Sequence, residues 1–177
     1  IDTTQIHKLD EVVVTGARFE SDVRHLPMTV SVVGRKQIEN TPSSSVLPVL
    51  TEQVPGMFVT SRGIMGYGIS GGAAGGMNLR GLGGSSARLM VLVDGHPQYM
   101  GLMGHPIADS YQSMMTERVE VLHGPASVIY GSNAMGGVVN IVTRQMREDG
   151  AQTHINLGGG SYGTLQTEAS NRIRKGK

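Results

Sequence analysis

The chain has 177 residues, with 15 Lys and Arg against 14 Asp and Glu and a formal net charge of +1. This balance gives no reason to expect binding to nucleic acid, for which a clear basic excess is typical. The sequence contains no cysteine, which excludes a disulfide scaffold, thiolate metal sites and a cysteine nucleophile. Glycine contributes 26 residues, about twice its usual share. Length and composition indicate one small, glycine-rich α+β domain.

Neither a transmembrane helix nor a signal peptide is expected in this chain. No segment approaches about 18 uninterrupted apolar residues, the length that indicates a membrane-spanning helix. The first residues, IDTTQ, have neither a basic nor an apolar region, so we expect any signal peptide to have been removed already.

The first third of the chain alternates short β-prone runs with short helical segments. Gly16 and Gly34 end two valine-rich runs, and Pro55-Gly56 ends the longer helical segment. Pro48 lies close enough to the start of that helix to be tolerated. The predicted elements are strands at 12–15, 29–33 and 57–60 and helices at 35–40 and 43–53.

A glycine-rich segment follows at 63–84, where 10 of 22 residues are glycine. Each glycine costs a helix about 1 kcal/mol relative to alanine, so we expect a loop there with one short strand at 77–80. The later predicted elements are a strand at 89–93 turned by Asp94-Gly95, a loop at 96–108, a helix at 109–115, a strand at 118–122, one or two helical turns from Pro125 to Gly131, and a strand at 138–143.

The last segment shows a different pattern, in which weakly apolar and polar residues alternate at 151–157 and again at 165–170. A period of two predicts two antiparallel strands joined by the turn at 158–163. The pattern fits an ordinary hairpin and also the strands of a transmembrane β-barrel.

A nucleotide site and a catalytic triad are both disfavoured. Residues 66–71 match GxGxxG, and Asp94 ends a later strand, as in a dinucleotide site. That mechanism needs a helix N-terminus facing the pyrophosphate, and the glycines that follow prevent this helix. The sequence has no GxxxxGK[ST] and no GxSxG motif. A nucleotide-dependent enzyme is therefore the weakest of the hypotheses considered.

Several of these segments, in this order, resemble the plug domain of a TonB-dependent outer-membrane transporter. The resemblance covers residues 10–145, and its specificity comes from the order and spacing of motifs that are weak singly. The segments that carry it are DEVVVTG at 10–16, the strand at 29–33, QVPG at 53–56, NLRG at 78–81, VLVDG at 91–95, ERVEVLHGPAS at 117–127, YG at 130–131 and GGVVNIVT at 136–143.

The resemblance implies an α+β fold, a small mixed β-sheet with short helices, that lies inside a barrel of about 22 strands. The implied organisation is an N-terminal arm with a TonB box at 1–16, a plug domain at 17–147 and the first, truncated barrel strands at 148–177. Two strands cannot close a barrel, so we expect the chain to be part of a larger receptor of the Gram-negative outer membrane.

The implied function is transport and not catalysis. The plug gates the barrel and contributes to binding of a metal chelate of the siderophore, haem or cobalamin class. The implied partners are the inner-membrane protein TonB, the chain's own β-barrel and the chelate, with no cofactor. The alternative is a stand-alone extracellular α+β binding or adhesion module, and the length of the native reading frame separates the two hypotheses.

The TonB box would bind TonB as an extended, unpaired segment that adds to the edge of a partner sheet. The residues that the resemblance assigns to this contact are Asp10, Glu11, Val12, Val13, Val14 and Thr15.

Four residues are implied to contact the barrel: Arg80, Arg118, Glu120 and His123. The family usually has Arg, paired with barrel carboxylates, where this chain has His123. We expect His123 to pair more weakly than Arg and to carry a charge that depends on pH.

Two loops on the outer side of the plug are implied to reach the ligand, at 62–77 and 96–107. Thioether and imidazole groups together suit haem iron or Cu(I), whereas methionine also serves as an apolar filler that coordinates nothing. The candidates for ligand contact are Met65, Tyr67, Met77, Tyr99, Met100, Met103 and His105, of which Met100, Met103 and His105 are also the candidates for metal coordination.

Overall fold

In the computed structural model, the residues described are 12–13, 21–22, 29–41, 43, 45–59, 77–84, 89–98, 111–146 and 148–176. The chain divides into two compact units between Thr143 and Arg144. The first unit contains one mixed and two antiparallel sheets with short helices, and the second is an antiparallel strand pair.

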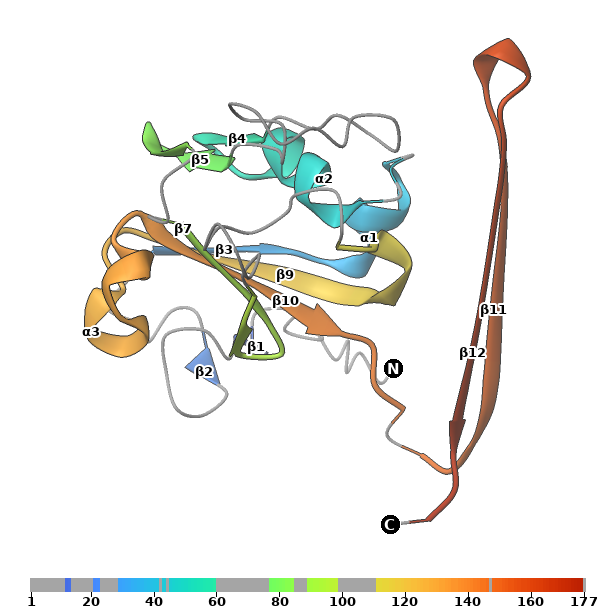
Figure 1. Ribbon diagram of the computed structural model, residues 1–177. Helices are drawn as coiled ribbons and strands as arrows, with labels where there is room; N and C mark the ends of the chain where they lie inside the picture. The colour runs from blue at the N-terminus through green and yellow to red at the C-terminus, as the bar shows by residue number, and fades with distance from the viewer. Residues whose placement is uncertain are drawn as a thin grey trace, which may run out of the picture. The chain divides into compact units, whose positions relative to one another are not determined.

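A five-stranded mixed sheet with the order β3-β9-β10-β7-β8 organises the first unit (Figure 1). Its central strand β10 pairs antiparallel with β9 and parallel with β7. The predicted strands at 29–33 and 89–93 are confirmed. They form because β-branched and apolar residues fit the surface of a pleated sheet. The strand bounds are β3 (Thr29–Val33), β7 (Leu89–Val93), β8 (His96–Pro97), β9 (Thr116–His123) and β10 (Gly137–Thr143).

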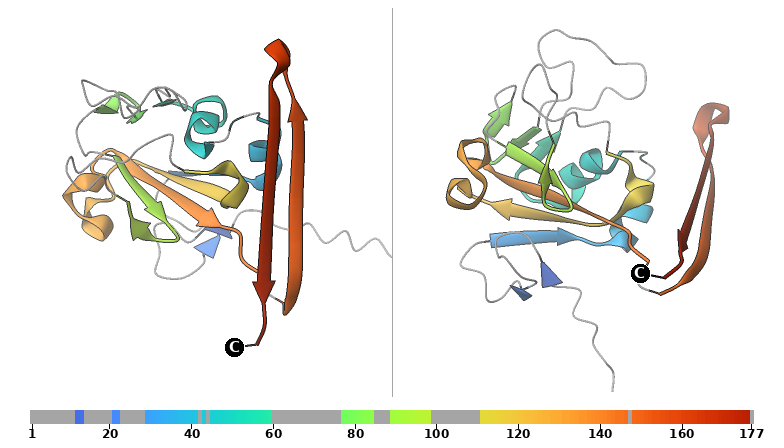
Figure 2. Two further views of the ribbon diagram at one scale, coloured as in Figure 1. Left: turned by 45° about the vertical axis from the view of Figure 1, so that its right-hand side comes forward. Right: turned by 60° about the horizontal axis from the view of Figure 1, so that its bottom comes forward.

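Two short helices, α1 (Arg35–Glu39) and α2 (Val46–Gln53), cover one face of this sheet (Figure 2). Helix α2 begins at Val46, three residues later than predicted, and the Val46 N–H donates to the Tyr111 carbonyl at 2.8 Å. Pro48 is in the first turn, where backbone N–H groups lack partners within the helix, so proline costs little there. The Arg35 guanidinium ties α1 to β9 by donating to the carbonyls of Ser113 and Thr116.

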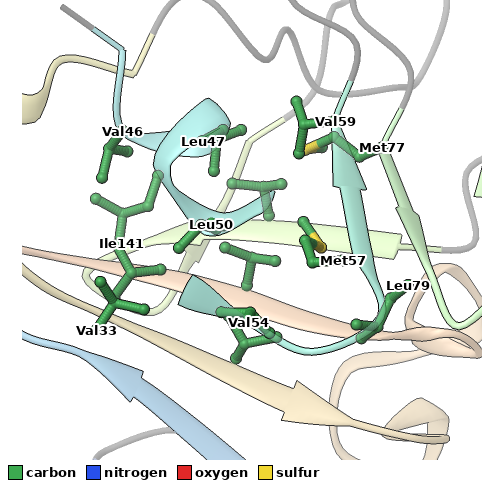
Figure 3. Close-up of a cluster of buried hydrophobic side chains, with 14 of the residues drawn as sticks. Val33, Val46, Leu47, Leu50, Val54, Met57, Val59, Met77, Leu79 and Ile141 are labelled. Atoms are coloured by element: carbon green, nitrogen blue, oxygen red, sulfur yellow. The ribbon is translucent and has the colours of Figure 1, made fainter. Parts of the chain in front are cut away.

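The main hydrophobic core lies between α2 and the sheet (Figure 3). Valine and leucine side chains from both layers fill it, which removes their apolar surface from water and stabilises the fold by about 25 cal/mol per Å² buried. The residues labelled in Figure 3 are Val33, Val46, Leu47, Leu50, Val54, Met57, Val59, Met77, Leu79 and Ile141.

A smaller sheet, β4-β5-β6, extends this core. Strand β6 (Leu82–Gly84) lies within the segment that the sequence predicts as loop, so that expectation is wrong for these three residues. Their backbone pairs with β5, and backbone hydrogen bonds do not require side chains. The other strands of this sheet are β4 (Met57–Val59) and β5 (Met77–Leu79).

Short helical turns complete the first unit. Of the helix predicted at 109–115, residues 111–115 are described; only Ser113–Met115 form a helical turn, the 3₁₀ turn η3, while Gln112 forms a β-bridge with Ser45, so the expectation of a helix is wrong for residues 111 and 112. Helix α3 (Ser127–Tyr130) ends at Gly131, whose φ of +87° suits glycine, and is followed by η4 (Ser132–Ala134).

The predicted N-terminal strand is present as β1 (Val12–Val13), but it is not unpaired as expected. It pairs antiparallel with β2 (Ser21–Asp22), with Val12 opposite Asp22. An extended backbone near a second extended segment gains hydrogen bonds for its N–H and C=O groups, which explains the pairing.

The second unit is a long hairpin of β11 (Gly150–Gly159) and β12 (Leu165–Arg174), joined through the 3₁₀ turn η5 (Ser161–Gly163). In this register Ile155 faces Ala169 and Leu157 faces Thr167, so the weakly apolar residues of both strands share one face. His154 pairs with Ser170 and Gln152 with Arg172 on the other face, which is polar. Within the described residues, no helix has the length and apolar character needed to span a membrane.

Gly137, at the start of β10, lies where the packing leaves no room for a side chain. A Cβ there would lie 2.6 Å from the Leu122 carbonyl oxygen and 2.8 Å from Leu79 Cδ2. We expect Gly137→Ala to lower the free energy of unfolding by ~1–3 kcal/mol, because overpacking displaces Leu79 and the sheet. Gly124→Ala is the control, since Gly124 also has a positive φ but no described atom near its Cβ position. Equal losses in chemical denaturation would show that backbone strain alone matters.

Candidate functional site

His123 is a buried polar residue at the last position of β9, with 8% of its surface exposed. It pairs with Thr29 of β3 on one side and with Gly137 of β10 on the other. Its Nε2 atom forms a hydrogen bond of 2.8 Å with the Ser31 hydroxyl. Its buried Nδ1 atom has no hydrogen-bond partner within the described residues. Buried polar atoms are normally paired, so this nitrogen marks a place where a partner is expected.

Arg80 lies in the turn between β5 and β6, directly after the core residue Leu79. Leu79 packs where Gly137 lacks a side chain, and Gly137 pairs with His123. The exposed Arg80 side chain therefore lies at the same end of the sheet as His123.

The surroundings of His123 favour its neutral form. Burial, and next the positive charge of Arg80, lower the pKa of His123 from its ordinary value of 6.5. A neutral imidazole offers its partner a hydrogen bond and not a charge. The expectation that the charge of His123 depends on pH stays a prediction, and the lowered pKa moves that dependence toward more acidic pH.

Arg118 and Glu120 interact with each other inside the first unit. Arg118 Nε donates to Glu120 Oε1 at 2.8 Å, and Glu120 is completely buried. Asn140, its neighbour on β10, approaches Glu120 Oε2 at 3.5 Å and accepts from the Gly95 N–H at 3.0 Å. This network supplies partners for the buried Glu120 carboxylate, because a charge buried in the sheet without a partner would be costly. Of the four residues predicted to contact the barrel, Arg118 and Glu120 pair with each other, Arg80 is exposed and His123 is buried; the contact with the barrel itself stays a prediction.

The Asp94-Gly95 turn holds the end of β10. Asp94 Oδ1 accepts from the Thr143 N–H at 2.8 Å, and Asp94 Oδ2 accepts from the Thr143 hydroxyl at 2.6 Å. Thr143 is the last residue of the first unit. The carboxylate therefore fixes the point at which the chain leaves the sheet.

Most predicted ligand contacts lie outside the described residues: Met65, Tyr67, Tyr99, Met100, Met103 and His105. Met77 is described and packs in the main core with 4% of its surface exposed. Of the predicted TonB contacts, the backbone of Val12 and Val13 is described, while Asp10, Glu11, Val14 and Thr15 are not. Among the described residues, no group of three or more His, Asp or Glu side chains could hold a metal ion.

Sequence reasoning missed Ser31 and Asn140. Both are ordinary strand residues by sequence, and their roles depend on the register of β3 and β10 against β9. The only local signal is that each interrupts a run of valine and isoleucine with a polar side chain.

Residues 22–138 match the model of the family described as TonB-dependent Receptor Plug Domain. In sequence, the chain is 32% identical over 157 residues to the vitamin B12 transporter BtuB of Vibrio vulnificus. That alignment covers 89% of this chain and 24% of the relative, so the chain spans about a quarter of the length of this relative.

Solved structures show the same fold. The alcaligin outer-membrane receptor FauA of Bordetella pertussis has a TM-score of 0.67 and 22% identity, covering 90% of this chain and 25% of that one. The ferric enterobactin receptor PfeA of Pseudomonas aeruginosa, a mutant in complex with enterobactin, has a TM-score of 0.50 and 33% identity, covering 73% and 19%.

The lowered pKa of His123 predicts a pH dependence of stability. The folded chain keeps His123 neutral where the unfolded chain binds a proton, so this contribution to stability is complete above pH 6.5 and is lost as the pH falls. Chemical denaturation between about pH 7.5 and 5.5 should show a steeper loss for the wild type than for His123→Gln, whose amide does not titrate in this range. Parallel curves would mean that His123 has the same pKa in the folded and unfolded chain.

Proposed function

Because this chain belongs to the TonB-dependent receptor plug domain family and is thus a non-enzymatic part of an outer-membrane receptor, we propose that it gates the barrel of an active transporter for a metal chelate. The observation that carries the proposal is the match of residues 22–138 to the family model, together with the mixed sheet and short helices of the first unit.

The proposed ligand class is a siderophore, haem or cobalamin chelate. The two relatives above 30% identity that are described here are a vitamin B12 transporter and a ferric enterobactin receptor. Vitamin B12 and ferric enterobactin are both large metal complexes, which supports the class and not a particular member. The loop residues proposed to contact the ligand are Met65, Tyr67, Tyr99, Met100, Met103 and His105.

The energy is proposed to come from the inner membrane through TonB, which would bind residues 10–15 by adding them as a strand to its own sheet. In the described pairing, β1 is one strand of a two-stranded sheet and so has an edge that β2 does not occupy. TonB could bind at this edge or replace β2. The N–H groups of successive strand residues point to opposite edges, so Val13 donates in one of these routes and lies within the paired strand in both.

The proposed contact with the barrel consists of Arg80 and His123. A barrel carboxylate beside them would bind the Arg80 guanidinium and supply a partner for the unpaired Nδ1 atom of His123. The hairpin β11–β12 is proposed as the first two barrel strands, with its apolar face toward lipid and its polar face toward the lumen.

Val13→Pro should abolish ligand uptake while leaving ligand binding intact. Proline removes the backbone donor and fixes φ, which prevents strand addition to TonB. Val13→Ala keeps the donor and serves as the control. Energy-dependent uptake and equilibrium binding of the chelate that supports growth would both be measured on the full receptor. Normal uptake by Val13→Pro would show that this segment is not the TonB box.

Arg80→Ala should loosen the seating of the plug in the full receptor. A barrel carboxylate left without its partner in a buried contact costs ~3–5 kcal/mol. The readout is the ion conductance of the purified receptor in planar lipid bilayers, which should rise for Arg80→Ala. Lys36→Ala, which removes an exposed cation on α1, should leave the conductance unchanged. Equal conductance of Arg80→Ala and the wild type would exclude Arg80 from the barrel contact.

A further inference from the structure

Arg80 adopts a backbone conformation that arginine rarely adopts. Arg80 and Gly81 form a two-residue turn between β5 and β6, with φ values of +52° and +77°. Two positive φ values in succession are typical of the type I′ turn, for which Asn-Gly and Asp-Gly are the preferred pairs. The Asp94-Gly95 turn, with φ values of +49° and +81°, follows that preference, whereas the Arg80 turn does not. A non-glycine residue held in this region depends on the surrounding structure to keep it there.

Gly56 is the neighbour that holds the Arg80 backbone. It ends the connection between α2 and β4, and its carbonyl accepts a hydrogen bond of 2.7 Å from the Arg80 N–H. Gly56 itself has a φ of +78°, which aims this carbonyl at the turn. The contact joins two segments that are distant in sequence and fixes the turn from outside its own hairpin.

Gly56 also limits the path of the Arg80 side chain. A Cβ on Gly56 would lie 3.1 Å from Arg80 Cγ, closer than most such contacts, and 3.7 Å from the Arg80 backbone nitrogen. The missing side chain of Gly56 therefore provides a flat surface on which the first carbons of Arg80 rest. Any substituent there would push the stem of Arg80 aside and move the guanidinium with it.

We propose that Gly56 is a positioning residue for Arg80, which holds the guanidinium at the end of the sheet beside His123. The proposal rests on the function proposed above in one respect only, which is that Arg80 contacts the barrel. The placement of Arg80 relative to His123 can be tested without the barrel.

The first experiment uses the pKa of His123 as a measure of the position of Arg80. The positive charge of Arg80 lowers the pKa of His123, so displacing the guanidinium should raise it. The residues of β3 and β10 paired with His123 are Thr29 and Gly137, and its side-chain hydrogen-bond partner is Ser31; none of these three titrates near neutral pH. The pKa of His123 is followed in the full chain by NMR titration, with His123→Gln to assign its signals.

Gly56→Asn is the main variant, because asparagine tolerates positive φ better than other side chains while still carrying a Cβ. We expect it to raise the pKa of His123 by at least about half of the rise that Arg80→Ala produces. Gly95→Asn is the matched control, since Gly95 has a φ of +81° and no described atom within 4 Å of its Cβ position. Gly56→Ala is a second variant with the same Cβ.

The proposal is overturned if Gly56→Asn and Gly56→Ala leave the His123 pKa at the wild-type value while Arg80→Ala raises it. It is equally overturned if Arg80→Ala has no effect, since the guanidinium would then not lie beside His123. A rise in Gly95→Asn as large as in Gly56→Asn would show a general effect of strain and would also reject the proposal.

The second experiment connects this position to the seating of the plug. In the full receptor, Gly56→Asn should raise the bilayer conductance, and it should add nothing further in the Arg80→Ala background, because it acts through Arg80. Additive effects would show that Gly56 has a merely structural role. If Arg80→Ala leaves the conductance unchanged, the barrel contact fails, and the pKa measurement alone decides whether Gly56 positions Arg80.

Discussion

The pairing of β10 with β9 and β7 is the constraint on which the first unit depends. β10 bonds in parallel to β7 and antiparallel to β9, whereas β7, which also pairs in both directions, has only the two-residue β8 as its antiparallel neighbour. Its side chains alternate between the core beneath α2, which receives Val139 and Ile141, and the smaller cluster on the opposite face, which receives Val138. A slip of one residue would exchange these two sets and place Asn140 under α2. It would also separate Asn140 from Glu120, so packing and polar pairing specify the same register.

The elements that the sequence predicts well are those defined by local composition. The strands at 29–33 and 89–93 have the predicted bounds because their residues are continuously β-branched or apolar. β6 was missed because Leu82–Gly84 has no side-chain pattern, and its pairing depends on the turn at Arg80. The pairing of Val12 with Asp22 was missed for a related reason, since β2 has a polar sequence that predicts no strand.

The candidate site divides in the same way. Arg80 and His123 were identified by the motifs around them, whereas Ser31, Gly56 and Asn140 enter through contacts between distant segments. Spacing along the chain cannot show that Gly56 lies against the Arg80 stem or that Ser31 on β3 reaches His123 on the neighbouring strand β9. The sequence also could not separate the role of Glu120 from that of Arg80, because both are charged residues in motifs that resemble those of the plug domain. Burial separates them, since Glu120 is enclosed by its own sheet and Arg80 is exposed.

The two hydrogen bonds from Asp94 to Thr143 have a mechanical consequence. They tie the end of β10 to a turn formed by the chain about fifty residues earlier. A tension applied to the chain beyond Thr143 would load this carboxylate before it reached the backbone bonds of β10, and the load would pass to β7 through the turn. Two strands would then share the load at that end, and the sheet would resist peeling there.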